Sequence, residues 1–500
     1  MAAGDGFTIE IPAVLSIAAT LNGLTSSGSH AAGALGLAVL DPISFATIGS
    51  EVASVNSTLQ SQLSTALGQL LQLLGQTNSK VSTAATGYAD LDAQIAALLG
   101  GGSGAATGAT ATSDGVYDRL RTARTPAEVR TQWDSLTADQ QRQLITDHPQ
   151  QIGAMNGVPA IARDQANRSV LASLQQQTKH ELAEAKSDLG SAWDHGDLFS
   201  MVPAQARVDA ATKQLSTMQH LQTVLGNGST QQYLLGVDTN GPGHWIVASG
   251  NPDTAQHVVT LVPGMNTPFS ADQVDGQAAH SATLLQAAHN AAPNDSTSVI
   301  TWAGYDSPQG ILQAVQTHYA ANGAAPLQSF QQGLYASHDG SAFTTMVAAH
   351  SYGTVVATDA ALAPGGLRTD ALAYLDSPGV PAANAASLGI PHVFATATSY
   401  DPVVHISDIV GQAGANEYNA EAAQFNGHLI PNPQDMAYHG TDPVSASFGA
   451  TRFDAGTGTP GLLSFLHMTA HSDVFNPAYP GPANLGQIAT GHYSAITAPK

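Results

Sequence analysis

Hydrophobic residues recur with two different periods along the chain, and the change of period separates two regions. Within the first hundred residues, apolar side chains recur at steps of three and four, which predicts one buried stripe along a long helix. After about Gln231 the period changes, and short apolar runs alternate with longer amphipathic stretches. We therefore expect an all-helical N-terminal region and, after it, strands that alternate with helices. The N-terminal stripe consists of Val55, Leu59, Leu63, Leu67, Leu70 and Leu74.

Composition places boundaries between these regions. The sequence of residues 1–98 predicts two helices that form a hairpin, and Asp41-Pro42 is the expected break between the two helices. Residues 99–115 are rich in glycine, alanine and threonine, as flexible linkers are. Residues 116–230 predict a charged helical lead-in or cap layer, and residues 231–500 a catalytic domain.

The second half predicts an α/β fold with a mostly parallel sheet. Strands joined through helices need right-handed crossovers, which place neighbouring strands parallel. The first two strands are separated by a turn sequence and should pair as a hairpin. The predicted strands are 233–237, 244–249, 257–262, 298–303, the run before Ser351, 371–375 and 392–397, and the predicted helices include 162–188, 270–292, 309–322 and 328–337.

A candidate nucleophile lies in Ala349-His350-Ser351-Tyr352-Gly353, between an apolar run and a helical stretch. A serine on a sharp strand-to-helix turn has its hydroxyl exposed, and the residues two positions away must be small because the helix folds back on the strand. Ala349 and Gly353 meet this requirement, although alanine replaces the first glycine of G-x-S-x-G. The pattern predicts a nucleophile elbow at Ser351, and an ordinary buried turn serine is the alternative.

A serine nucleophile needs a histidine base and a carboxylate that orients it. In this arrangement the chain order is serine, acid, histidine. Asp401 follows the late strand 392–397 and is the preferred acid, with Asp376, after the preceding strand, as the alternative. His471 is the preferred base because it follows the last apolar segment. The other histidines considered are His428, His439, His467 and His492.

Two backbone N–H groups should stabilise the developing oxyanion. One is expected from Tyr352, the residue after the serine. The other is expected from the loop after strand 257–262, where Gly264 lets the backbone approach and Met265 or Asn266 supplies the donor.

Composition restricts the other possibilities. The 500 residues carry a formal net charge of −22, which argues against a nucleic-acid partner. Cysteine is absent, so neither thiol catalysis nor disulfides are available. The first basic residue is Lys80, so no signal peptide with a charged start is expected, and no apolar run suggests a transmembrane segment. His467 and His471 are spaced as a metal pair, but no H-E-x-x-H motif accompanies them, and no metal or cofactor is predicted.

These motifs together resemble an actinobacterial α/β-hydrolase family long catalogued as a domain of unknown function. The resemblance covers residues 117–475 and implies an α/β-hydrolase fold with Ser351, Asp401 and His471 as its catalytic triad. Asp376 stands where that family favours a small residue. The matching segments are 124–129, 157–168, Val262-Pro263-Gly264, 302–306, the serine turn, Ser377-Pro378-Gly379, Asp401-Pro402, 440–443, 448–450 and His471-Ser472.

The N-terminal region carries a second resemblance. Tyr88 and Asp92 form Y-x-x-x-D just after the predicted hairpin. A helical hairpin followed by this motif is similar to substrates of type VII secretion systems, although the Trp-x-Gly turn common there is absent. The resemblance implies a secreted or cell-envelope location and a helical-hairpin export partner. The alternatives are a cytoplasmic protein and a tyrosine and aspartate that are merely neighbours on a helix.

These observations favour a serine hydrolase that cleaves an ester or related acyl bond of a small-molecule or lipid substrate. The alternative is a secreted, non-catalytic interaction protein or effector on the same scaffold.

Overall fold

The computed structural model describes residues 113–226, 230–314, 316–340, 342–399, 401, 436–437, 439–459 and 469–499, all within the unit Ala111–Lys500. The predicted hairpin at 1–98, most of the predicted linker, Tyr88 and Asp92 lie outside the described residues. So do His428 and His467.

Helices form the first described segment, as the sequence predicts. They are α4 (Ser113–Leu120), α5 (Pro126–Asp134), α6 (Ala138–Asp147), α7 (Pro149–Ala154), α8 (Ala160–Asp194) and α9 (Leu198–Gly226). The Thr125 side chain accepts from the Glu128 N–H, and Pro126 occupies the first turn of α5. Thr137 and Gln140 form a capping box at α6. Threonine caps therefore fix the starts of both helices.

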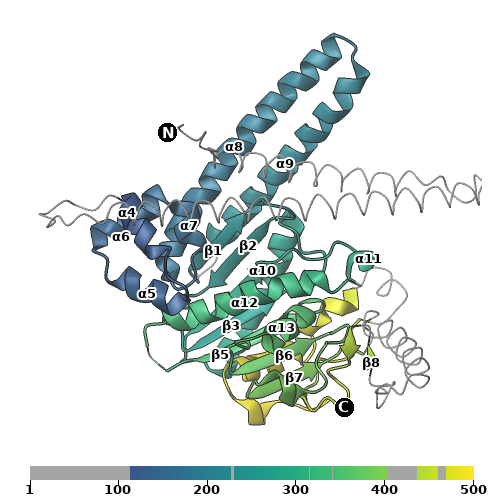
Figure 1. The fold of residues 1–500 in the computed structure, drawn as a ribbon. Coiled ribbons are helices and arrows are strands. Elements are labelled where there is room, and N and C mark those ends of the chain that lie inside the picture. Colours follow the sequence, from purple (N-terminus) through teal and green to yellow (C-terminus); the bar gives the residue numbers. More distant parts are fainter. Residues whose placement is uncertain are drawn as a thin grey trace, which may run out of the picture. The chain divides into compact units, whose positions relative to one another are not determined.

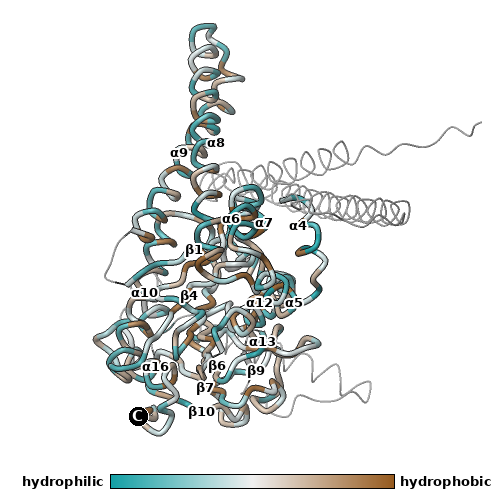
Figure 2. Tube along the Cα trace, turned by 90° about the vertical axis from the view of Figure 1, so that its left-hand side faces the viewer, coloured by the Kyte–Doolittle hydropathy of each residue, from teal (hydrophilic) through white to brown (hydrophobic). Residues whose placement is uncertain are grey.

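Helices α8 and α9 pack against each other along a seam of small residues. The outer buried positions of α8 are Thr178, Ala185 and Ala192, and those of α9 include Ala204, Ala211 and Met218. A spacing of seven is that of a coiled coil. The helix pair extends away from the sheet (Figure 1). Hydrophilic and hydrophobic residues alternate along both helices (Figure 2). Helix α8 continues past the predicted end at Asp188 because this seam continues.

The centre of the molecule is a mixed sheet of order β1-β2-β4-β3-β5-β6-β7-β10. Strands β1 (Gln232–Asp238) and β2 (His244–Ser249) form the predicted antiparallel hairpin. Strand β2 pairs antiparallel with β4 (Thr297–Ala303). All other pairs of this sheet are parallel. The remaining strands are β3 (His257–Val262), β5 (Thr344–His350), β6 (Ala371–Leu375), β7 (His392–Thr396) and β10 (Thr451–Arg452).

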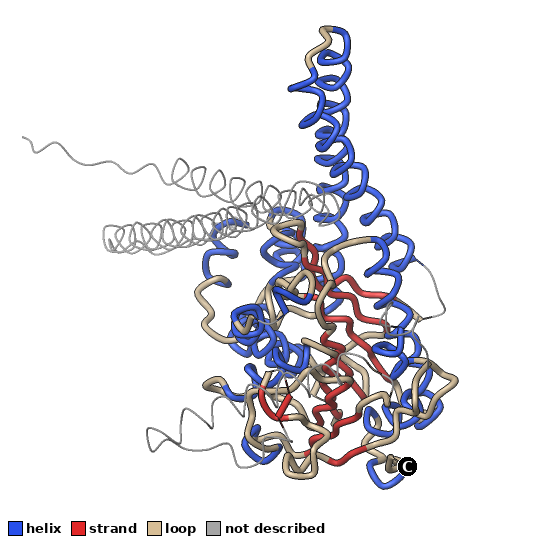
Figure 3. The backbone as a smooth tube through the Cα atoms, turned by 90° about the vertical axis from the view of Figure 1, so that its right-hand side faces the viewer, coloured by secondary structure: helices blue, strands red, loops and turns tan. Residues whose placement is uncertain are grey.

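Helices cover both faces of the sheet (Figure 3). Alternate residues of β5 show the division, since Val347 and Ala349 belong to one buried cluster and Met346 and Ala348 to the other. The first cluster packs under α12 (His318–Ser337) and α13 (Gly353–Leu362), the second under α10 (Ala271–Ala291) and α16 (Gly481–Ala489). This layered architecture confirms the predicted α/β fold.

Two details differ from the prediction. The expected helices 309–322 and 328–337 are instead a short α11 (Ile311–Ala314) and one long α12, which continues through Pro326. The helix is held on both sides of that proline by buried packing, of Ala320 and Ala324 before it and of Leu327, Phe330 and Leu334 after it. The two-residue strand β10 was not predicted, because so short a segment carries no period. Strands β8 (Met436–Ala437) and β9 (Gly440–Thr441) form a separate small sheet.

No helix among the described residues is both long and apolar enough to cross a bilayer.

Candidate active site

The serine turn has the local geometry that its sequence predicts. Strand β5 ends at His350, α13 begins at Gly353, and Ser351 lies between them with a φ of 56°. The Ser351 N–H donates to the Leu375 carbonyl at 2.9 Å, which ties the turn to β6. A Cβ at Gly353 would lie 2.3 Å from the Val262 carbonyl oxygen. A side chain at position 353 would therefore push α13 away from β3.

Backbone strain gathers around this turn. Among the described residues, the non-glycine positions with positive φ are Asn266, Ser351 and Asp376. They follow β3, β5 and β6, which are consecutive neighbours in the sheet. Strained backbone of this kind persists where the surrounding structure enforces it, and it concentrates at functional sites. The strain thus identifies the carboxyl edge of these three strands as the candidate active site.

The preferred acid and base lie in contact. His471 Nδ1 is 2.7 Å from Asp401 Oδ2, and both residues are buried, 7% and 0% exposed. Burial alone would lower the pKa of His471. The charge and hydrogen bond of Asp401 outweigh burial and raise that pKa above its ordinary value. Because a carboxylate only accepts, the proton on this side of the ring is at Nδ1.

His350 joins the serine turn to the histidine. His350 Nε2 donates to the carbonyl oxygen of His471 at 2.7 Å, and the two rings lie 4.8 Å apart. Burial, followed by the neighbouring His471, holds the pKa of His350 well below its ordinary value, so this ring is neutral. Sequence reasoning treated His350 only as part of the turn motif. Its position immediately before the candidate nucleophile is the sequence signal that could have indicated this contact.

The candidate nucleophile and the candidate base are not hydrogen-bonded to each other. Within the described residues, no hydrogen bond joins Ser351 Oγ to His471, and His471 Nε2 is buried without a hydrogen-bond partner. Nε2 is the atom that would accept the serine proton. Such contacts are often loose in unliganded enzymes and tighten when substrate binds.

The loop after β3 lies against the serine. A Cβ at Gly264 would be 2.5 Å from Ser351 Cβ and 2.8 Å from its Oγ. The Gly264 carbonyl accepts from Thr267 Oγ1 at 2.7 Å, and Tyr305 OH donates to the Pro263 carbonyl at 2.9 Å. In a trans peptide the N–H points opposite to the carbonyl, so fixing the Gly264 carbonyl also fixes the N–H of Met265. Tyr305 thus helps to hold this loop.

The two predicted loop donors differ. The Asn266 N–H already donates to the Pro308 carbonyl at 2.8 Å, and its side chain accepts from the Gly310 N–H. In the described part of the chain, the N–H groups of Met265 and Tyr352 have no such backbone partner. This arrangement favours Met265 over Asn266, together with Tyr352 at the start of α13.

Asp376 occupies a different position from Asp401. It is fully buried, and its oxygens accept from Thr398 N at 2.6 Å and Thr398 Oγ1 at 3.2 Å. The Asp401 N–H in turn donates to the Thr398 carbonyl. Burial, and then the charge of Asp401, raises the pKa of Asp376 to about 8. Asp376 thus holds the turn that carries Asp401, and it is a neutral acid at pH 7.

Two of the other histidines are described. The His439 ring meets the edge of Tyr352 at 5.3 Å, and burial lowers its pKa. His492 Nδ1 lies 3.0 Å from Thr490 Oγ1, after α16. The ring of His492 has no carboxylate ion-pair partner among the described residues. The described chain also contains no group of three acidic or histidine side chains suited to a metal ion.

We predict that Gly264→Ala removes most of the activity. The added Cβ would displace Ser351 or the loop that carries Met265, so turnover should fall by about a hundredfold or more, as when an oxyanion donor is lost. Gly276→Ala in α10 is the matched control, because nothing lies within 4 Å of its added Cβ. It should keep full turnover and stabilise the helix by about 1 kcal/mol. Steady-state kinetics and urea unfolding measure both effects, and a fully active Gly264→Ala enzyme would contradict this loop geometry.

Comparisons with known proteins agree with this architecture. Residues 238–410 match the alpha/beta hydrolase family. An uncharacterized protein of Mycobacterium tuberculosis is 29% identical over 382 residues, which are 74% of this chain and 56% of that protein. A second uncharacterized protein of this organism is 31% identical over 176 residues, 34% of this chain and 64% of the relative. The chain thus spans about half the length of the first relative.

Among solved structures, an esterase from the hyperthermophilic archaeon Pyrobaculum calidifontis aligns with 56% of this chain and 88% of its own. Its sequence identity is 10% and its TM-score 0.25.

Proposed function

We propose that this chain, whose residues 238–410 match the alpha/beta hydrolase family, is a serine hydrolase that cleaves an ester or related acyl bond. One observation carries the proposal. A buried carboxylate, Asp401, lies 2.7 Å from the ring of His471, whose backbone is hydrogen-bonded to the residue before Ser351. A serine on a strand-to-helix turn, followed along the chain by an acid and then a histidine, supplies the parts that acyl transfer needs.

In the proposed mechanism, Ser351 Oγ attacks the acyl carbon and its proton passes to His471 Nε2. Asp401 keeps the other ring proton at Nδ1 and stabilises the imidazolium. The N–H groups of Met265 and Tyr352 would stabilise the oxyanion. His471 then donates its proton to the leaving alcohol, and a water molecule, deprotonated by the same ring, releases the acid and restores the serine.

Labelling with a fluorophosphonate tests this proposal. The probe phosphonylates activated serines, so we expect one stoichiometric adduct at Ser351, located by peptide mass spectrometry, and none in Ser351→Ala. His471→Ala should slow labelling strongly, because the serine would lose its base. An unlabelled folded protein would instead favour the non-catalytic interaction protein. Export through residues 1–98 stays a prediction, because those residues lie outside the described structure.

The pH dependence of kcat/KM should reflect the raised pKa of His471. The ring must be neutral to accept the serine proton, and Asp401 stabilises its charged form. The midpoint of the acid limb of the profile should therefore lie above pH 6.5, and kcat/KM should increase as pH rises through that midpoint. Initial rates with p-nitrophenyl acetate across pH 5 to about 9 measure the limb. A limb at or below the ordinary histidine value would contradict the assignment of this ring as the base.

A further inference from the structure

A cleft of about 600 Å³ lies outside the candidate active site. Its walls come from α7, α8, the β1–β2 hairpin, the end of β4 and α12. None of Ser351, Asp401 and His471 lines it. The proposed hydrolase chemistry therefore leaves this cleft without a role.

A buried arginine faces the cleft. Arg163 is 5% exposed and donates from Nε to the Gly153 carbonyl, from Nη1 to Asn156 Oδ1 and from Nη2 to the Leu235 carbonyl. A guanidinium has five N–H donors, so one on each terminal nitrogen lacks an acceptor among the described residues. All three acceptors are neutral, and within the described chain no carboxylate lies within ion-pair distance of Arg163. Burial lowers the pKa of Arg163 to about 10, and the charge of the more distant Asp253 opposes this shift only in part, so the guanidinium is still charged at neutral pH.

A buried guanidinium without a carboxylate in direct contact is unfavourable, and an anion that reached it would improve its charge balance and accept its remaining N–H groups. Carboxylates and phosphates match the planar guanidinium because they accept two N–H groups at once. The cleft is open to solvent through exposed Gln150 and Ala154 at the end of α7, so such an anion can enter.

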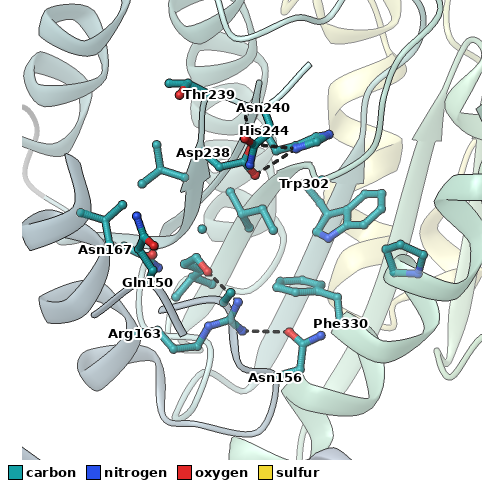
Figure 4. A pocket seen from close by; sticks show the side chains of 18 of the residues that line it. Gln150, Asn156, Arg163, Asn167, Asp238, Thr239, Asn240, His244, Trp302 and Phe330 are labelled. Atoms are coloured by element: carbon teal, nitrogen blue, oxygen red, sulfur yellow. Dashed lines mark hydrogen bonds and ion pairs between the residues drawn. The ribbon is translucent and has the colours of Figure 1, made fainter. Parts of the chain in front are cut away.

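The middle of the cleft is aromatic. The Phe330 ring lies 5.7 Å from the guanidinium carbon of Arg163 and 6.3 Å from the ring of Trp302. Figure 4 shows Arg163 and Asn156 at one end, Phe330 and Trp302 along one wall, and Asp238, Asn240 and His244 at the opposite end. This wall suits an apolar or aromatic body.

The far end of the cleft is acidic. His244 lies between Asp238, 3.0 Å from Nδ1, and Asp306, 3.0 Å from Nε2. Burial would lower the pKa of His244, but the hydrogen bonds and charges of these two aspartates raise it to about 9. Two carboxylates and one imidazolium leave a net negative charge, which disfavours a second anionic group on the ligand.

We propose that this cleft binds a small organic monoanion, which presents a carboxylate or phosphate oxygen pair to Arg163 and lays an apolar body along Phe330 and Trp302. The proposal does not depend on the hydrolase assignment, since no residue of the candidate active site takes part.

Isothermal titration of the full chain tests the proposal with 3-phenylpropionate and methyl phenyl phosphate as the two monoanionic probes. At least one should bind with a Kd below about 1 mM, and 3-phenylpropionamide, the neutral match of the first, should bind at least tenfold more weakly. The comparison between probes identifies which oxyanion the cleft prefers. Arg163→Met should remove the preference for the acid over the amide. Arg168→Met is the matched control, because Arg168 pairs with Asp164 and does not line the cleft.

A second variant is needed because Arg163→Met also removes three hydrogen bonds. Ala154→Phe fills the cleft from an exposed position and leaves those bonds intact, so it should fold normally and bind the anion at least tenfold more weakly. Three outcomes would each overturn the proposal. The acid and the amide could bind equally, the folded Ala154→Phe chain could bind the anion as well as the unmodified chain, or neither anion could bind at concentrations up to about 10 mM.

Discussion

Ser351→Ala is expected to lower kcat by about 10⁴- to 10⁶-fold while leaving the fold intact. The methyl group cannot form the acyl-enzyme bond, and the remaining rate would come from the oxyanion donors and substrate binding. No hydrogen bond to Ser351 Oγ is formed within the described residues, so its removal takes no stabilising contact from them. His471→Ala should cause a loss of similar size. The double variant should be hardly worse than either single one, because the two residues act as a unit.

The matched control is Ser281→Ala. Ser281 is as buried as Ser351 and bonds Thr301 Oγ1 at 2.6 Å, but it lies on α10, which covers the opposite face from α13. It should lose about 1 kcal/mol of unfolding free energy and keep normal turnover. Single-turnover kinetics and urea unfolding on all four variants separate the two effects. Residual activity in Ser351→Ala within tenfold of the unmodified enzyme would rule out this serine as nucleophile.

Asp401→Asn is expected to reduce kcat by about 10⁴-fold, and Asp376→Asn by less than about tenfold near pH 7. An asparagine amide at position 401 would turn an N–H toward His471 Nδ1 and disfavour the required tautomer. At position 376 the carboxyl group is already neutral at this pH, so asparagine resembles it, and its amide oxygen can still accept from Thr398 N. Steady-state kinetics on the pair distinguish the two acids. Inactive Asp376→Asn with active Asp401→Asn would reverse the assignment.

The Asp376 variant has a second readout. A carboxyl group with a raised pKa favours the folded state when protonated, so its contribution is fully present below its unfolded pKa of about 4 and is lost as pH rises toward 8. Asp376→Asn should therefore show a flatter dependence of unfolding free energy on pH across that window. Parallel slopes for the two proteins would contradict a protonated Asp376.

The sequence predicted the parts whose local pattern and tertiary environment agree. The strand before Ser351 is apolar and continuous because it is buried on both faces, and Gly353 is small because β3 lies against it. The predicted pair Asp401 and His471 proved to be in contact, although whether they act with Ser351 is left to the experiments above.

Other features depend on contacts between distant residues and leave no local signal. The hydrogen bond from His350 to the His471 backbone joins residues 121 positions apart. The hydrogen bond from the Asn266 N–H to the Pro308 carbonyl also joins residues that are distant in the sequence. It occupies the Asn266 N–H and so favours Met265 as the oxyanion donor. Helix α12 continues through Pro326 because of the core beneath it, against local preference.

The small residues that join α8 to α9 have a mechanical consequence. Alanines allow the two helices to approach closely, but each buries little apolar surface, so every turn of the outer seam is only weakly held. Large apolar side chains near the far end, among them Trp193 and Phe199, are instead 72% and 95% exposed. The pair should therefore unzip from its far end inward, with amide protons exchanging fastest near Gly196 and progressively slower toward the sheet.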